Sequence, residues 1–460
     1  MLINKFIKNF PIFTNSDMEI KLVITAYFIV VIVIGIISWF KIKTPADYYI
    51  AGKRAGIFQV SGSLLATILG GSAILGTIEL SHKIGWAALW FLSSAAIGLL
   101  FLVPVSKYVS RYGNFTLPEL LGKFYGKKTE IIASAIIPVA WTGIIAAQII
   151  AAAKILIVSN VLSYQEGVAT AGAVFIAYTL LGGQLSILKT DTFQALLIIA
   201  GIIILSVFAL KESPAIFLKN NNIEHLFNSS FTPVDLLILV LTYSVTFVVG
   251  PDIYSRIFCA KNEKTASKSV LIVALILIPV SFLLTYVGIY SGRSGAEDVI
   301  NFAGNLLPGW IYGLFIAALL SAVMSSADTT LLNSSIILSE LVSENLNKIS
   351  AVKLTRLFVV VLGFIGIIIS IFVNSIVDAL LFALTLFSGA FTIPTLFGLL
   401  GVSTKKHNII YAVIIGGIMA LSGKIITAYV NDSIGNIVII SSFAISFTLL
   451  FRFKKSNSES

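Results

Sequence analysis

Residues 61 to 85 read SGSLLATILGGSAILGTIELSHKIG, an apolar stretch that is long enough to cross a bilayer as a helix. Gly70, Gly71 and Ser72 stand near its middle, where a continuous helix would have Ala or Leu, because glycines weaken a helix interior. We therefore expect the helix to be interrupted here. Glycines that only allow close packing between membrane helices are the alternative explanation.

A second stretch, TYSVTFVVGPDIYSRIF from 242 to 258, contains Gly250, Pro251 and Asp252. The proline removes a helical hydrogen bond, so it marks either an interruption or the cytoplasmic end of a helix. The two stretches each open a set of five apolar segments, 57–211 and 212–403. A repeat with an odd number of crossings inserts opposite to its twin, and inverted-repeat transporters pair their broken helices near the bilayer midplane.

The composition indicates an all-α integral membrane protein, since 57% of the 460 residues are hydrophobic and only 11% are charged. About 13 segments are long enough to span the hydrocarbon. Their expected ranges are 18–40, 57–84, 85–107, 129–158, 166–183, 184–211, 232–256, 266–291, 308–343, 352–374, 377–403, 406–428 and 433–453. Residues 1–56 and 404–460 then form peripheral segments outside a 5+5 inverted-repeat core.

The positive charges predict the orientation. Most of the 31 Lys and Arg residues, with Arg256 counted among them, fall in alternate loops that face the cytoplasm if the N-terminus is outside and the C-terminus is inside. The net charge of +10 is therefore a signal of topology in the cell membrane, and no nucleic-acid partner is implied.

Few polar side chains interrupt the apolar segments. The run MSSADTT at 324–330 places hydroxyls beside Asp328, and such oxygens are the ligands of a hard cation. Asp191 begins a helix, either as a cap or as a cation ligand. Gln148 lies near the middle of its segment, where it contacts either a substrate or a neighbouring helix.

The sequence contains no pattern typical of an enzyme. It has no HExxH zinc motif and no phosphate-binding Gly-Lys loop, and we expect a transporter that does not hydrolyse ATP.

The chain from about 47 to 400 resembles the sodium:solute symporter family. The matching stretches are ADYYIAGKR at 46–54, SLLAT at 63–67, NFTLPELL at 114–121, AYTLLGG with a following TD at 177–191, and AVMSSADTTLLNSS at 322–335. The resemblance implies Na⁺-coupled symport of a small organic solute by alternating access.

The resemblance also implies two ion sites. A central Na⁺ would be bound by three backbone carbonyls and two hydroxyls, those of Ala66, Leu69, Ala322, Ser325 and Ser326. A second cation nearer the cytoplasm, found in some members, would be bound by Asp191, Asp328 and Thr329. Two carboxylates there would bind a cation strongly, or one of them would carry a proton.

The substrate pocket of the family lies beside the helix breaks. The residues that correspond to its walls are Thr67, Ile68, Gly70, Gly71, Ser72, Phe91, Tyr243, Thr246, Phe247 and Leu381. The polar residues of sugar-transporting members are replaced here by apolar or aromatic ones, which disfavours a sugar. An amino acid or monocarboxylate is favoured, because backbone N–H groups at a helix break bind anions.

Two alternatives remain. The coupling ion could be H⁺, because Lys189, Asp191 and Asp328 are titratable. The chain could also be a membrane sensor that does not transport.

Overall fold

The structure is a computed structural model that describes residues 15–112, 116–157, 163–181, 183–212, 226–295, 298–343, 349–373 and 375–451. Residues 1–14 and 452–460 at the two ends, 213–225 between the two expected repeats, the first two residues of NFTLPELL and Gly182 of AYTLLGG lie outside this part.

The described residues fold into helices, and none of them forms a β-strand. The helices in the first half are α2 (Asn15–Trp39), α3 (Pro45–Ile50), α4 (Ile57–Ile68), α5 (Gly71–Ile84), α6 (Leu89–Tyr112), α7 (Leu117–Tyr125), α8 (Lys127–Ile157), α9 (Tyr164–Leu181) and α10 (Gln184–Glu212). Those in the second half are α12 (Pro233–Leu239), α13 (Val245–Val249), α14 (Pro251–Cys259), α15 (Glu263–Arg293), α16 (Val299–Leu306), α17 (Gly309–Val342), α18 (Ile349–Phe372), α19 (Ile376–Leu399), α20 (Ile409–Tyr429) and α21 (Asp432–Leu450).

Eleven helices of the described chain are long and apolar enough to cross a membrane, so the protein is a multi-pass membrane protein. This number differs from the expected 13 for two reasons. The expected segments 57–84 and 85–107 overlap one continuous apolar stretch, Gly71–Arg111, and α9 is not among the eleven. Within that stretch Gly85 has a φ of +60°, a conformation that suits glycine, and it turns the chain between α5 and α6. The count of 13 stays a prediction.

Both stretches with central glycines are broken in the structure. The first helix ends at Ile68, and α5 starts again at Gly71 after an extended Gly70 with ψ 167°. In the second, a π-helical turn at Val240–Ser244 leads into α13, and the extended Gly250 separates α13 from α14. Each break leaves helix-end backbone groups without helical partners inside the protein.

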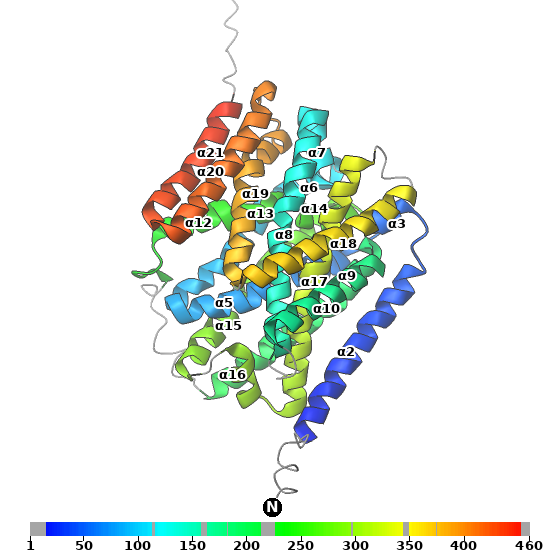
Figure 1. The fold of residues 1–460 in the computed structure, drawn as a ribbon, viewed down its shortest axis with the longest axis vertical. Coiled ribbons are helices and arrows are strands. Elements are labelled where there is room, and N and C mark those ends of the chain that lie inside the picture. Colours follow the sequence, from blue (N-terminus) through cyan, green and yellow to red (C-terminus); the bar gives the residue numbers. More distant parts are fainter. Residues whose placement is uncertain are drawn as a thin grey trace, which may run out of the picture.

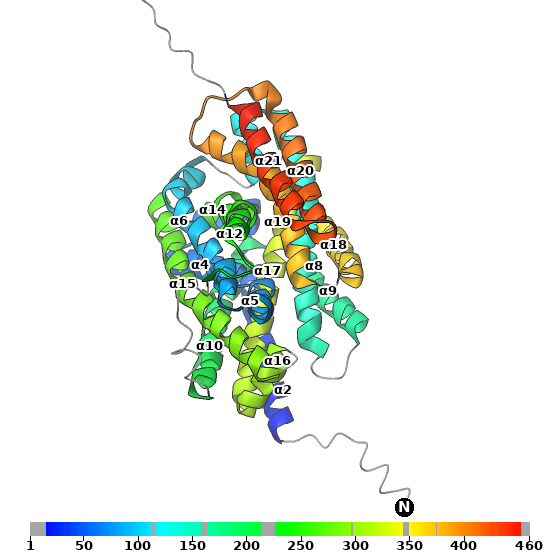
Figure 2. The same cartoon turned by 90° about the vertical axis from the view of Figure 1, so that its left-hand side faces the viewer.

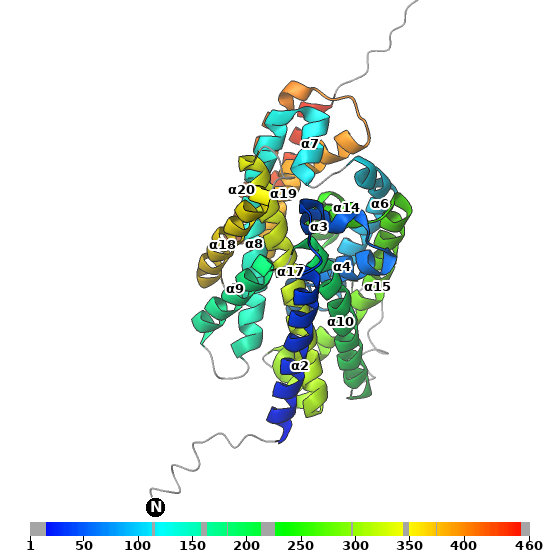
Figure 3. The ribbon, with the colours of Figure 1, turned by 90° about the vertical axis from the view of Figure 1, so that its right-hand side faces the viewer.

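The long helix α17 lies in the middle of the fold and contacts α8, α10, α4 and α2 (Figure 1). Figure 2 shows α20 and α21 side by side at one edge, packed on α19. Figure 3 shows α2 on another side of the molecule, running along α10 and α17. The broken helices therefore meet α17 in the interior, away from the peripheral helices.

The stretch at 46–54 packs against α10 and supports it. Thr44 and Asp47 cap α3 reciprocally, and Arg54 pairs with the Asp47 carboxylate. Tyr48 packs on Gly183, where an added Cβ would lie 2.7 Å from its ring, so only glycine fits at the start of α10. This contact fixes the end of the helix that carries Asp191.

Candidate functional site

The break between α4 and α5 is pressed against α17. A Cβ on Gly70 would lie 2.2 Å from Ser326 Oγ, and a Cβ on Gly71 would lie 2.1 Å from Val323 Cγ2. Neither glycine has a positive φ, so the backbone conformation does not require glycine at these positions. The close approach of α17 does require it, because a Cβ would clash. Neither glycine is among the lining residues of the cavity described below, so their place at the substrate stays a prediction.

The polar side chains of the MSSADTT run and of the next turn of α17 fall into three groups. The hydroxyl of Thr330 donates to the Ser326 carbonyl of its own helix, as do other α17 hydroxyls to theirs. Ser325, Ser326, Thr329 and Asn333 instead form one broad face of the helix, and each bonds to another helix. Asp328 points to a different side and accepts a bond from Thr179 of α9 at 3.1 Å.

Of the residues expected to bind the central Na⁺, Ser326 meets the end of α4 at the break, whereas Ser325 bonds to Asp191. Ser326 Oγ donates to the Thr67 carbonyl at 2.7 Å. The Leu69 N–H bonds back to the Leu65 carbonyl, so the next carbonyl, that of Ala66, lies at the open end of α4. Neutral carbonyl and hydroxyl oxygens suit Na⁺, and the described residues contain no cluster of three or more His, Cys, Asp or Glu side chains. The donor set at this break therefore fits Na⁺.

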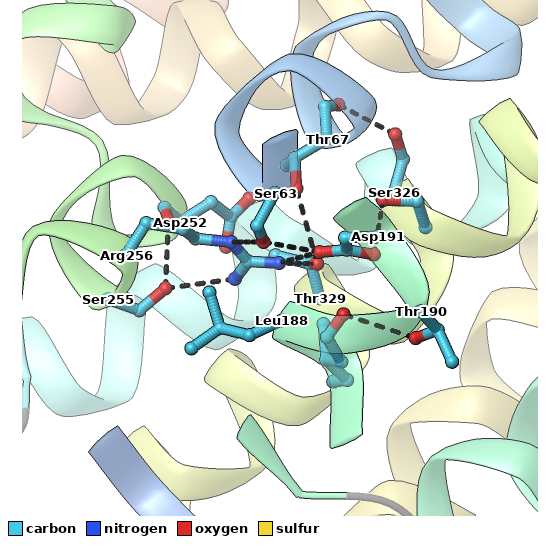
Figure 4. A network of polar contacts seen from close by, with 12 residues as sticks. Ser63, Thr67, Leu188, Thr190, Asp191, Asp252, Ser255, Arg256, Ser326 and Thr329 are labelled. Carbon is cyan, nitrogen blue, oxygen red and sulfur yellow. Dashed lines mark hydrogen bonds and ion pairs between the residues drawn. The ribbon is translucent and has the colours of Figure 1, made fainter. Parts of the chain in front are cut away.

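Beside this break lies a buried arginine that sequence reasoning placed in a cytoplasmic loop. The Arg256 side chain is fully buried, and its Nη2 lies 3.0 Å from Asp191 Oδ2. Its Nε donates to Ser63 Oγ at 3.1 Å, its Nη1 donates to Ser255 Oγ at 3.0 Å, and its Nη2 also donates to Thr329. The guanidinium thus joins α4, α10, α14 and α17 (Figure 4).

This network changes the environment expected for Asp191. Its Oδ2 accepts from Ser63 as well as from Arg256, and its Oδ1 accepts from Ser325 at 2.6 Å. The guanidinium therefore stands where a second cation was expected beside Asp191 and Thr329, and Asp328 is turned toward Thr179. A metal cation at this position stays a prediction that requires Arg256 to move.

A cavity of about 80 Å³ lies next to the two breaks. The predicted pocket residues in its lining are Thr67, Ile68, Ser72, Gln148, Tyr243, Thr246 and Phe247. Ser326 also lines it, so the expected ion ligand and the expected solute pocket share a wall. Gln148 Nε2 donates to Ser72 Oγ at 2.6 Å, which places its amide at the N-terminus of α5.

Phe91 and Leu381 lie elsewhere, in the lining of a second cavity of about 240 Å³. The Phe91 ring stacks on Tyr243 with centroids 4.6 Å apart, and Tyr243 in turn meets Phe247 edge-on. Because Tyr243 lines the first cavity and Phe91 the second, this ring pair forms a partition between the two.

Four further side chains at the site were missed from the sequence. Asp252 and Trp141 line the first cavity, Asn333 bonds to Asp252, and Arg256 holds Asp191. The signal that could have found two of them is the spacing of Asp252 and Arg256. Charged residues four apart share one helix face, and these follow directly after a Gly-Pro interruption in an apolar segment.

The sequence and the fold of this chain both resemble those of known proteins. The model of the sodium:solute symporter family matches residues 48–416. The sodium/proline symporter of Haemophilus influenzae is 27% identical over 442 residues, covering 87% of each chain. The sodium/pantothenate symporter of Escherichia coli is 24% identical over 344 residues, covering 69% of this chain and 71% of its own. The substrate-bound outward-open structure of a Na⁺-coupled sialic acid symporter has a TM-score of 0.76 at 18% identity, covering 94% of this chain and 97% of that one.

Proposed function

Since this chain belongs to the sodium:solute symporter family, in which Na⁺ is the coupling ion, we propose that it carries a small organic carboxylate across the cell membrane together with Na⁺. The observation that carries the proposal is the position of Ser326. This residue lines the solute cavity and also bonds to the Thr67 carbonyl at the helix break. An ion bound beside Ser326 touches the wall of the solute cavity. Binding of the ion and binding of the solute therefore favour each other.

The chemistry of the cavity supports a small carboxylate. At the N-terminus of α5 the Ser72 N–H donates to Gln148 Oε1 at 3.4 Å, and Gln148 Nε2 donates to Ser72 Oγ at 2.6 Å. The positive end of the helix suits an anion, which would replace Gln148 Oε1 as the acceptor of the Ser72 N–H. Aromatic and aliphatic side chains form most of the remaining wall, among them Trp141, Tyr243 and Leu380. A sugar would find few hydrogen-bond partners on such a wall.

The size of the cavity narrows the class further. One water-sized group needs about 10 to 15 Å³ of such space, so the cavity takes roughly five to eight non-hydrogen atoms. Proline, named for the Haemophilus influenzae relative, is of this size, whereas pantothenate and sialic acid are larger. A small amino acid or short monocarboxylate is therefore the proposed solute.

We propose that the two broken helices open inverted repeats, within 13 crossings that leave the N-terminus outside and the C-terminus in the cytoplasm. In support of this, each break lies in the first apolar segment expected for its set, at Gly70 for 57–211 and at Gly250 for 212–403. Alternating access then takes place around the cavity between them.

The test is uptake into liposomes that contain the full chain. With a protonophore present, an inward Na⁺ gradient should drive accumulation of a labelled small carboxylate from a panel that includes L-proline, L-alanine and lactate. Uptake driven only by a pH gradient, and indifferent to Na⁺, would contradict the proposal.

A further inference from the structure

The carboxylate of Asp252 faces the solute cavity at the start of α14, immediately after the second helix break. Trp141 Nε1 donates to Asp252 Oδ2 at 2.8 Å, and Asn333 Nδ2 donates to Oδ1 at 2.8 Å. Both donors are neutral, so they hold the carboxylate in place without cancelling its charge. The Thr330 hydroxyl is a third neighbouring donor. Because each carboxylate oxygen accepts two bonds, the group can still accept a further bond from the cavity.

The nearest cation is already engaged. Arg256, one turn along the same helix, forms its ion pair with Asp191 and donates to Ser63, Ser255 and Thr329. The electric field of the Arg256 charge reaches Asp252. Among the described residues, however, the only ion pair of Arg256 is the one with Asp191. A buried carboxylate without a cation is costly, and the cavity beside it is where a cation could be supplied.

Another part of the cavity wall has the reverse character. Ser72, at the positive N-terminal end of α5, and Gln148 line the same cavity as Asp252. The cavity is therefore lined both by a helix N-terminus, which suits an anion, and by a carboxylate, which suits a cation. A solute that matches both parts of the wall carries a carboxylate and a protonated amine.

We propose that Asp252 is the ammonium site of the solute cavity, so that the transported solute is a small zwitterionic amino acid. The solute ammonium donates to the free acceptor positions of Asp252, and its carboxylate lies toward Ser72 and Gln148. Asn333 and Trp141 are positioning residues, because they fix the carboxylate that the ammonium meets. This inference rests on the proposed function and selects, within small carboxylates, those that carry an amine.

L-Alanine and lactate test it directly, because they differ only in an ammonium for a hydroxyl group. The purified full chain is titrated with each in NaCl, and the shift in melting temperature reports binding. L-Alanine or L-proline should bind at least tenfold more tightly than lactate, a difference of about 1.4 kcal/mol. Asp252→Asn should remove this preference, and Asp252→Glu should keep part of it. The matched control is Asp378→Asn, which removes a carboxylate from the exposed start of α19.

The outcomes separate this inference from the proposed function. If lactate binds as tightly as the amino acids and Asp252→Asn changes neither affinity, the ammonium site is wrong while small-carboxylate symport stands. If Asp252→Asn instead abolishes the stabilisation by NaCl alone and leaves the preference for amines, the residue binds the ion and the inference is also wrong. If no small carboxylate binds in NaCl, both fail. A cooperative thermal unfolding transition in each buffer shows in every case that the variant is folded.

Discussion

Arg256 Nη2 and Asp191 Oδ2 lie 3.0 Å apart at the meeting point of four helices, and neither side chain is exposed by more than 1%. Taking two charges out of water is expensive, and this pair compensates with bonds to Ser63, Ser255, Ser325 and Thr329. The pair therefore fixes the relative positions of α10 and α14 and with them the floor of the ion site.

Arg256→Gln should destabilise the protein by about 3 to 5 kcal/mol, because it leaves Asp191 buried and unpaired. The double variant with Asp191→Asn should recover much of this loss. Thermal unfolding of the full chain in detergent measures both. The control is the half-exposed Lys154–Glu79 pair at 2.6 Å, whose removal should cost about 0 to 1 kcal/mol. Equal losses of stability on breaking the Arg256–Asp191 pair and the Lys154–Glu79 pair would contradict this account.

Ser326→Ala should raise the Na⁺ concentration for half-maximal uptake about tenfold, on the order of 1.4 kcal/mol. The variant loses a hydroxyl that stands at both the break and the cavity. Ser335→Ala is the matched control, because the one partner of Ser335 Oγ in the described part of the chain is the Leu331 carbonyl of its own helix. Sodium dependence that is the same in both variants would remove Ser326 from the site.

Asp328→Asn should stabilise the protein in Na⁺-free buffer and reduce the stabilisation that Na⁺ provides. The Asp328 side chain is buried beside a neutral Thr179 hydroxyl, so its charge is costly until a cation binds nearby. Melting temperatures measured with and without Na⁺ give both quantities. An unchanged Na⁺-induced shift would leave Asp328 as a helix-packing residue.

Gly71→Ala should impair uptake by forcing the α4–α5 break away from α17, since the new Cβ would lie 2.1 Å from Val323 Cγ2. Adding Val323→Ala removes that atom and should restore much of the activity. Gly56→Ala, where nothing lies within 4 Å, is the neutral control. Failure of the second substitution to rescue the first would point to a direct role for Gly71 at the solute.

The two helix breaks could be predicted because glycine pairs and Gly-Pro are weak points in otherwise apolar helices. The contacts that explain Gly70 and Gly71 could not be predicted, because they depend on which face of α17 meets α4. Arg256 was misplaced for a related reason. A positive residue at the end of an apolar segment fits a cytoplasmic loop, and only the fold shows that α14 carries it into the interior.

The stacked rings of Phe91 and Tyr243 also affect how tightly the flux of Na⁺ is coupled to the flux of solute. The two rings separate the larger cavity from the smaller one, and under the proposed function they would be a barrier to ions that travel without solute. Replacing Phe91 with a residue that has a small side chain would join the two cavities. The membrane would then lose part of its sodium gradient as an uncoupled current, and each solute molecule carried would consume more of the cell's stored energy.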